Sequence, residues 1–313
     1  MKYLNLIGTL FVVFFCANNM LAQQDAQYTQ YMYSTLTVNP AYAGSRGVLS
    51  AVAIHRSQWL GIEGAPATNT LSAHTPLGKR RKVGLGVTIV NDRVGPVTEN
   101  YLSTDFSYTL DLKKNNKLSF GLKATAQMLN IDLQSLTLYS YTDPSFYSST
   151  DNTISPNIGM GFYYHNDSSY LGASVPNLLE TEHFQTTHDG GERTLSSVDR
   201  VSYYFIGGHV FPLNYQIDMK TAFLVKFVAG APIQTDISTS FRFNDRFTLG
   251  VNYRLRSALS LLGGIQLNDN LMIGMTYDYE ITELQQYSSG TFEALVRFEL
   301  FNKLSNMMTP RFF

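Results

Sequence analysis

Histidines are the side chains of this sequence best suited to acid–base or metal chemistry, because imidazole titrates near neutral pH and binds metal ions. Six are present, at His55, His74, His165, His183, His188 and His209. His183, His188 and the adjacent Asp189 lie in one polar stretch and have the donor types of a metal site. A solvated polar loop explains the same residues, and it is the interpretation that we favour.

His55 and His74 fall on consecutive predicted strands, so we expect them to be neighbours inside the fold. Two histidines without a partner carboxylate more often form a hydrogen-bonded pair than a reactive site. The chain has no Gly-x-Ser-x-Gly elbow, no His-Glu-x-x-His zinc helix and no P-loop lysine motif. The sequence therefore predicts no catalytic residues, no cofactor and no metal.

Residues 1–22 have the features of a secretory signal peptide, with an apolar run over residues 4–15 and Ala22 before the expected cleavage point. No later stretch approaches the roughly 18 apolar residues of a membrane helix. The only cysteine, Cys16, belongs to this leader, so no disulfide is expected. The balance of 23 basic and 24 acidic residues, with no basic cluster larger than residues 79–82, argues against a nucleic-acid partner.

Apolar and polar residues alternate with period two from Arg46 onward, which is the pattern of β-strands. One face of the stretch 271–281 carries Leu271, Ile273, Met275, Tyr277 and Tyr279. Its other face carries Gly274, Thr276, Asp278 and Glu280. The elements that must position any functional side chain are therefore strands.

The polar face distinguishes a soluble sandwich from a membrane barrel. It is dominated by Gly, Ser, Thr, Ala and Asn rather than by Lys and Glu, and charged residues make up only 15% of the chain. The apolar face is rich in Tyr and Phe, as in outer-membrane barrels that place apolar residues toward lipid and aromatic girdles at the interfaces. A charge facing lipid would cost about 2–4 kcal/mol. Lys123, Arg254 and Asp278 are therefore expected to face inward.

Fourteen strands are predicted, an even number, as bacterial outer-membrane barrels require. They are 46–57, 67–77, 82–92, 98–112, 117–130, 155–165, 168–176, 200–212, 217–229, 232–243, 246–256, 258–267, 270–281 and 290–301. The two longest links, 131–154 and 177–199, both join an odd strand to the next even one. This parity places them outside the cell. We expect a barrel over residues 46–301, a tail at 302–313 and an outer-membrane location.

The charges predicted to line the lumen carry both signs. The cations are Lys123, Lys220, Lys226, Arg254 and Arg256. The anions are Asp105, Asp111, Asp278, Glu280 and Glu293. A selective pore tends to concentrate one sign, so a salt-bridged, partly filled interior is the favoured interpretation, with an open pore as the alternative.

The segment before the first strand, "YTQYMYSTLTVNPAYAGSRG", is unusually rich in tyrosine. Tyr28, Tyr31, Met32, Thr35 and Leu36 fall at helical spacing, which predicts a short amphipathic helix. After it, Asn39 is expected to cap a second turn that starts at Pro40 and ends at Gly44. We expect residues 23–45 to form a plug or rim with Tyr42 packed inward; a loosely ordered lead-in is the alternative.

A second motif, "HRSQWLGIEGAPAT", follows the first predicted strand. Arg56 and Gln58 alternate with Ser57 and with Trp59, the only tryptophan. Gly61, Gly64 and Pro66 then predict a defined turn. Trp59 is either an interfacial girdle residue or the anchor of a protein-binding loop, and the girdle is favoured.

These two motifs together resemble the PorP/SprF family, outer-membrane proteins linked to the type IX secretion system and gliding motility of Bacteroidota. Further similarities are "NDRVGP" at residues 91–96 and "GTFEALVRFEL" at the last strand. The resemblance covers essentially the whole mature chain. It implies a role without chemistry. The residues of the two motifs are then expected to bind a partner or to serve the structure: Asn39, Pro40, Tyr42, Gly44, Arg56, Gln58, Trp59, Gly61, Gly64 and Pro66.

The resemblance also implies partners. It suggests binding to the C-terminal domain of a secreted adhesin or another type IX substrate, or to periplasmic parts of the secretion machinery, within the lipid of the outer membrane. A passive pore or solute transporter is the alternative, motivated by the polar lumen. A lipid hydrolase has less support, because no paired nucleophile and base is visible.

Overall fold

The computed structural model describes residues 26–132, 150–183, 186–187, 193–194 and 197–300. The predicted signal peptide and the predicted C-terminal tail lie outside these residues. No helix in this part of the chain is long and apolar enough to cross a membrane.

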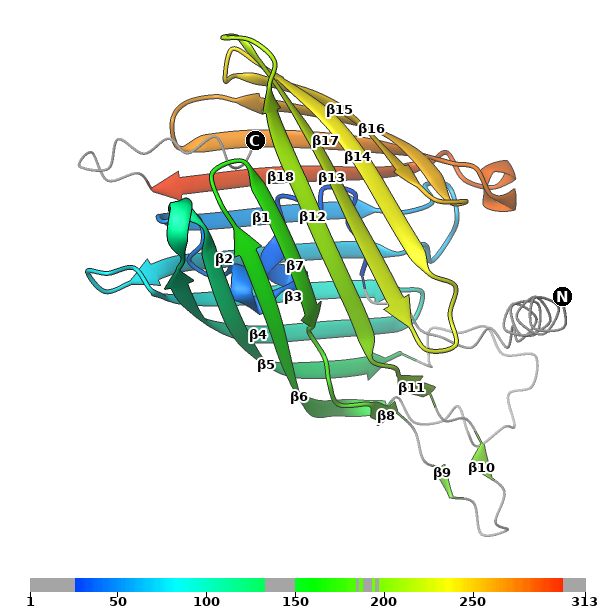
Figure 1. The fold of residues 1–313 in the computed structure, drawn as a ribbon. Helices are drawn as coiled ribbons and strands as arrows, with labels where there is room; N and C mark the ends of the chain where they lie inside the picture. Colours follow the sequence, from blue (N-terminus) through cyan, green and yellow to red (C-terminus); the bar gives the residue numbers. More distant parts are fainter. Residues whose placement is uncertain (1–25, 133–149, 184–185, 188–192, 195–196, 301–313) are drawn as a thin grey trace, which may run out of the picture.

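Fourteen antiparallel strands of the described residues form a closed barrel (Figure 1). They are β1 (Leu49–Ser57), β2 (Ala67–Leu77), β3 (Val83–Val94), β4 (Val97–Asp111), β5 (Lys117–Ile131), β6 (Thr150–His165), β7 (Ser169–Val175), β12 (Ser202–Pro212), β13 (Ile217–Val228), β14 (Gln234–Phe243), β15 (Phe247–Arg254), β16 (Ala258–Gln266), β17 (Leu271–Glu280) and β18 (Thr291–Leu300). β1 pairs with β18 from Leu49 opposite Leu300 to Ser57 opposite Phe292, which closes the ring. The predicted fourteen-strand barrel is confirmed, with the largest boundary differences at the starts of β1 and β6.

The two ends of the barrel differ in the length of their links. Counted in chain order, each even barrel strand is joined to the next odd one by a short turn, such as residues 78–82 and 244–246. These turns all lie at one end, here called the inner end. The long links, 132–149 and 176–201, are both at the opposite, outer end. Link 176–201 contains two short ribbons that project from the barrel (Figure 1). They are β8 (Thr181–His183) with β11 (Ser197–Asp199), and β9 (Thr186–Thr187) with β10 (Arg193–Thr194). Long links are extracellular in outer-membrane barrels.

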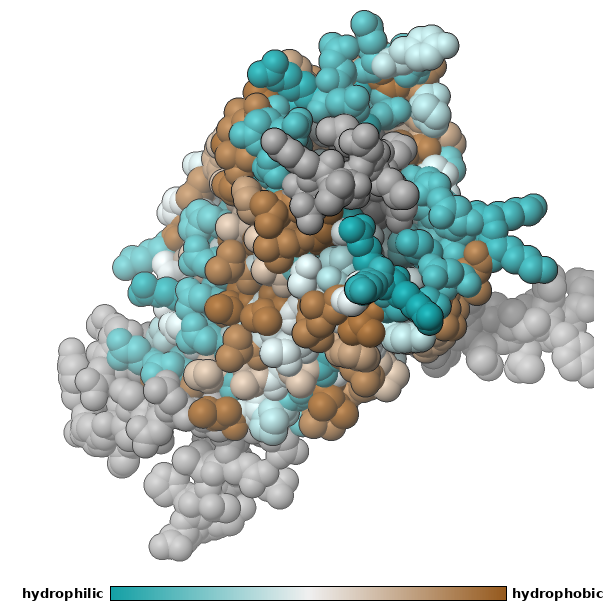
Figure 2. Space-filling model, turned by 90° about the vertical axis from the view of Figure 1, so that its left-hand side faces the viewer, coloured by the Kyte–Doolittle hydropathy of each residue, from teal (hydrophilic) through white to brown (hydrophobic). Residues whose placement is uncertain are grey.

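Apolar side chains face away from the lumen, as the alternation predicts. In β18, for example, Phe292, Val296 and Phe298 are more than 40% exposed, whereas the alternating Glu293 and Glu299 are buried. Apolar residues cover much of the outer wall, and hydrophilic residues gather at projecting turns (Figure 2). Because lipid replaces water around such a wall, its apolar exposure is compatible with stability.

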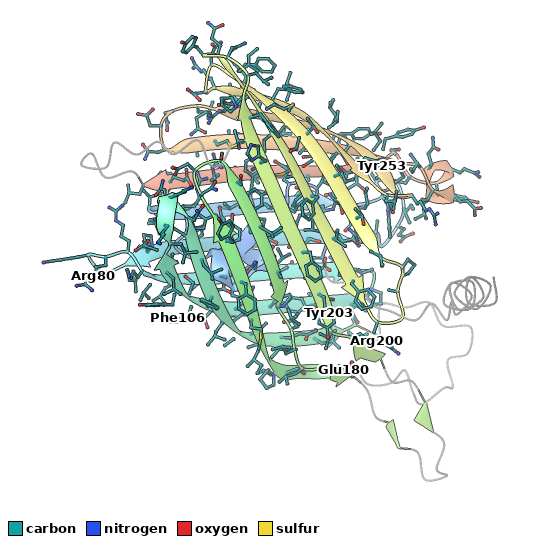
Figure 3. The ribbon with its side chains drawn as sticks, viewed as in Figure 1. Arg80, Phe106, Glu180, Arg200, Tyr203 and Tyr253 are labelled. Atoms are coloured by element: carbon teal, nitrogen blue, oxygen red, sulfur yellow. The ribbon has the colours of Figure 1, made fainter. Side chains whose placement is uncertain are left out.

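Exposed aromatic residues form a girdle near each end of the barrel. Phe106 lies toward the inner end, whereas Tyr203 and Tyr253 lie toward the outer end (Figure 3). Further exposed aromatics toward the inner end are Tyr108, Phe120, Phe162, Tyr164, Phe211, Phe247 and Phe298. Tyr and Phe are enriched where the membrane meets water. The labelled charges Arg80, Glu180 and Arg200 lie beyond the girdles, at the two ends (Figure 3).

The lumen is occupied by the segment that precedes β1. It contains α2 (Thr35–Val38) and η1 (Pro40–Tyr42), and its tyrosines and Leu36 form the centre of the buried hydrophobic cluster. The predicted helix starting near Tyr28 is wrong in extent, because residues 29–33 form turns and only four residues are α-helical. Residues on every side of the segment are buried, including Thr29, Gln30 and Tyr33. A segment surrounded by barrel wall needs no solvent face, so helical periodicity was a poor guide to it.

Candidate functional site

The segment of residues 26–47, here called the plug, runs through the lumen from its outer third to its inner end. Near the outer end the Tyr28 hydroxyl is 2.6 Å from the Thr70 hydroxyl on β2. Midway, the Tyr31 hydroxyl is 3.1 Å from the Ser238 hydroxyl on β14. Burial raises the pKa of both phenols above the ordinary value of 10.0, so both are neutral donors and acceptors at physiological pH.

An ion cluster holds the outer part of the plug. The backbone N–H groups of Thr29 and Gln30 each donate to the Glu293 carboxylate at 2.9 Å. The Thr29 hydroxyl donates to Asp278 at 2.7 Å. The Arg56 guanidinium donates to Thr29, Glu293 and Asp278 at 3.1, 2.9 and 2.8 Å. Arg56, Asp278 and Glu293 are each about 1% exposed, so this hydrogen-bonded network is buried.

A lysine holds the middle of the plug at the C-terminus of α2. The Lys123 ammonium donates to the carbonyls of Leu36 and Thr37 at 3.2 and 3.0 Å. It also lies 3.5 Å from the Asp105 carboxylate, which is directly opposite it on β4. Helix C-termini present carbonyls without intrahelical partners and favour a cation. Lys123 therefore orients α2 against the β3–β5 wall.

Asn39 and Pro40 shape the turn near the inner end. The Asn39 side-chain oxygen accepts from the Ala41 N–H at 3.0 Å, and its amide group donates to the Phe162 carbonyl at 2.9 Å. Pro40 occupies the first position of η1, where its missing N–H costs nothing. Asn39 therefore caps the turn and joins it to β6.

Three wall glycines make room for this turn. A Cβ atom on Gly84, Gly121 or Gly161 would overlap Ala43, Ala41 or Asn39 of the plug, respectively. These glycines belong to β3, β5 and β6, and together they form a seat for the plug backbone. The Ser107 hydroxyl donates to the Ala43 carbonyl at 2.7 Å in the same region.

The plug ends at a second set of polar contacts, next to the start of β1. The Gly44 N–H donates to His74 Nδ1 at 3.0 Å, and Gly44 has a positive φ of 71°. Arg46 donates to both oxygens of Glu299 at 2.5 and 2.6 Å. Burial alone would lower the pKa of Arg46, but the Glu299 carboxylate outweighs burial and the pKa is raised. The Tyr42 ring packs edge-on against His74 and Tyr163.

The second motif closes the outer end of β1. The N–H of Gln58 donates to the Pro66 carbonyl at 2.9 Å, and that of half-buried Trp59 to the Thr291 hydroxyl at 3.1 Å. Gly61 and Gly64 have positive φ values of 100° and 74°, as the predicted turn requires. Trp59 thus lies in the loop that follows the strand.

The predicted site residues therefore form two groups at opposite ends of the lumen. One group contains Asn39, Pro40, Tyr42 and Gly44, and the other contains Gln58, Trp59, Gly61, Gly64 and Pro66. Arg56 connects the second motif to the plug through Thr29. Sequence reasoning missed Thr29 and Lys123 as plug contacts. The alternation had placed Lys123, Asp278 and Glu293 inside, but nothing in the sequence named their partners.

Several predicted positions are corrected by the structure. His55 and His74 are not neighbours: His55 faces outward and bonds Asn69 and Ser57, whereas His74 is buried in the lumen. In β2 the period-two alternation puts His74 on the inner face with Thr70 and Ser72. His55 pairs with Asn69, which is on the outer face. Arg256 is exposed in the turn after β15, and Asp111 is largely exposed at the inner end of β4.

The polar stretch with His188 and Asp189 lies outside the described residues. His183 ends β8. Within the described part of the chain, no group of three potential metal ligands is found. A cavity of about 80 Å³ remains between the plug and the wall, lined in part by Tyr28, Val38, Ser103 and Asn177.

Known structures share this architecture. The toluene transporter TbuX of Ralstonia pickettii has a TM-score of 0.51 at 10% identity, over 83% of this chain and 91% of that chain. Omp33 of Acinetobacter baumannii has a TM-score of 0.46 at 7% identity, over 81% and 98%. Such identities show the outer-membrane barrel fold alone.

Sequence comparison is more informative. No curated protein sequence matches the chain. The sequence model of the family described as "Type IX secretion system membrane protein PorP/SprF" matches residues 20–298, and so includes the plug and nearly all of the barrel. This chain therefore belongs to the PorP/SprF family of type IX secretion system membrane proteins.

Proposed function

We propose that this protein is a non-enzymatic outer-membrane component that binds the C-terminal domain of a secreted surface protein, such as an adhesin, at its outer end. Binding there would help that protein to be secreted or to stay attached to the cell surface. Family membership supports the secretion context. The outer end is the reasonable docking side because the long links and the ribbons project from it.

This proposal rests mainly on the plug, which is hydrogen-bonded to the barrel wall along its length. It is attached by Thr29 and Gln30 near the outer end, by Lys123 in the middle, and by Gly44 and Arg46 near the inner end. A filled lumen makes the barrel a scaffold rather than a conduit. A scaffold acts through its exposed ends, and here one end faces the cell exterior.

The inner end offers a second docking side. Its short turns carry Lys79, Arg80, Arg81 and Lys82, and Lys113 and Lys114 in η2 (Lys113–Asn115). Periplasmic components of the type IX machinery are the partners that this end would meet.

Deletion of the gene tests the main proposal. Surface and secreted proteins of the deletion strain are compared with wild type by protease shaving of intact cells and quantitative mass spectrometry. We expect one or a few secreted proteins to be lost from the cell face and restored by the plasmid-borne gene. Identical surface and secreted profiles in the two strains would contradict the proposal.

A passive pore is the second candidate, favoured by the polar lumen wall and the residual cavity. The fold is shared with the toluene transporter TbuX, which makes transport a reasonable alternative. Purified protein in planar bilayers distinguishes the two, because a pore conducts stably whereas a plugged scaffold is nearly silent.

A further inference from the structure

Two loops at the outer end are joined into one unit, here called the outer loop pair, residues 58–66 and 281–290. The Leu60 N–H donates to the Gly290 carbonyl at 2.9 Å, and the Ser289 N–H donates to the Leu60 carbonyl at 2.7 Å. η5 (Glu283–Gln286) lies at the tip of the second loop, which extends past the strand ends (Figure 1). Backbone bonds across two loops give a preformed surface, and such a surface loses little conformational entropy on binding.

This unit exposes large apolar side chains to its surroundings. Tyr287 is 72% exposed, and Leu60, Ile281 and Leu284 are between 36% and 44% exposed. They are held by ordered backbone, since the Tyr287 N–H donates to the Leu284 carbonyl at 3.0 Å. Rigid aromatic and aliphatic residues grouped on exposed loops are typical of binding surfaces.

The charged residues of the outer loop pair are all acidic. Glu63 and Glu283 are both exposed, and residues 58–66 and 281–290 contain no Lys, Arg or His. Arg56, just before the first loop, is buried. Exposed basic residues outside the pair include Arg93 near the end of β3, on one side, and Arg256 after β15, on the other. A partner with basic residues beside apolar ones would complement this surface.

The same charge argues against two other occupants. A second copy of the chain would bring an equally acidic loop pair to a symmetric contact, and like charges oppose one another. Exposed carboxylates also oppose burial of the loops in lipid, because they would lose hydration. A protein surface that carries the opposite charge is the occupant that remains.

We propose that the outer loop pair is the docking surface for the secreted protein, and that this partner presents basic side chains next to apolar ones. The inference rests on the proposed function and specifies where and how the partner binds. Tyr287 and Leu284 supply the apolar contact, and Glu63 and Glu283 supply the attraction. Binding is therefore expected to weaken as ionic strength rises.

Two double variants test this surface in the deletion strain, each expressed as the full chain. Leu284→Ser/Tyr287→Ser removes the apolar contact, and Glu63→Lys/Glu283→Lys reverses the charge. Matched controls are Ile233→Ser at another outer link and Asp269→Lys at an inner turn, since both residues are exposed outside the loop pair. The readout is the surface amount of the proteins that the deletion removes, with barrel folding checked by gel mobility of unheated samples.

We expect both double variants to lower the surface amount about tenfold or more, as loss of binding anchors does, whereas both controls behave as wild type. Loss in the deletion strain with normal display in both double variants would overturn the docking surface and leave the proposed function standing. No loss in the deletion strain would overturn both. A purified wild-type dimer that becomes monomeric in Leu284→Ser/Tyr287→Ser would instead assign the surface to self-association.

Discussion

The Arg56 guanidinium lies 3.1 Å from the Thr29 hydroxyl, and this contact joins the barrel wall to the plug. Arg56 is one residue from the end of β1, directly before the outer loop pair. Its partners Asp278 and Glu293 are near the outer ends of β17 and β18, which flank the second loop of that pair. The plug, the closing strands of the barrel and its outer loops thus share one buried ion cluster.

Replacing Arg56 by Ala should destabilise the barrel. The change leaves Asp278 and Glu293 buried without their cation, which costs about 3–5 kcal/mol for a buried pair. We expect Arg56→Ala to unfold at a lower urea concentration than wild type. The unfolding midpoint is measured by the gel mobility of unheated samples. Arg256→Ala is the control, because Arg256 is exposed in an outer turn and should have little effect. Equal midpoints for the two variants would contradict the role of the cluster.

A methyl group on Gly121 should displace the inner part of the plug. Its Cβ atom would overlap the backbone of Ala41, so the plug would have to shift away from the wall. We expect Gly121→Ala to release Arg46, whose side chain is only 10% exposed in the wild type, so that trypsin cleaves after it, with the products identified by mass spectrometry. Gly263→Ala is the matched control, since a Cβ atom there meets nothing within 4 Å. Resistance of both variants to trypsin would argue against the glycine seat.

The pair Lys123 and Asp105 should behave as a coupled unit. Lys123→Met alone leaves the Asp105 carboxylate buried without its cation and should cost about 3–5 kcal/mol. The double variant Lys123→Met/Asp105→Leu removes both charges and should recover most of the lost unfolding free energy. A double-mutant cycle in urea measures this coupling. Additive losses in the double variant would show that the two residues act independently.

Removal of residues 26–44 should convert the silent barrel into a conducting one. The plug fills the lumen, and the wall behind it carries many small polar and charged side chains, which favour water. We expect near-zero current for wild type in planar bilayers and a stable conductance for the deletion variant. The full-length variant Gly121→Ala, in which the plug is displaced but still present, should show intermittent current. A silent deletion variant that migrates as a folded barrel would mean that other residues block the lumen.

The plug tyrosines should ionise only at high pH. Burial raises the pKa of Tyr28, Tyr31, Tyr33 and Tyr42 above 10.0. Their contribution to stability is complete below the unfolded pKa of 10.0 and is lost as pH rises through the higher folded values. Ultraviolet titration of phenolate should therefore show a fraction of tyrosines that resists ionisation in wild type, and this fraction should be smaller in the variant lacking residues 26–44, which carries none of the four. An equal resistant fraction in the two proteins would place these tyrosines in water.

The number of strands and the facing of most of their side chains could be predicted from the sequence. Alternation in a strand is a local property with period two, so Asp278 and Glu293 could be placed inside and Tyr279 and Phe292 outside without knowing any partner. The same rule puts His55 and His74 on opposite faces of the wall, so the expectation that they are neighbours was wrong. Turn chemistry likewise indicated a turn at Gly61 and Gly64, and both residues have positive φ.

The sequence by itself determined the barrel, because a wall between lipid and a polar lumen requires a two-residue repeat that is visible in any single strand. It also marked residues 28–47 and 55–68 as unusual. Only the tertiary structure decided that the two motifs meet, because Thr29 contacts Arg56, Asp278 and Glu293 across up to 264 positions of the chain. Such contacts depend on ring closure between β1 and β18, which no local pattern encodes. The path of the plug could not be predicted from local sequence either. The wall surrounds this segment on every side, so it has no solvent-facing polar side that would indicate its orientation.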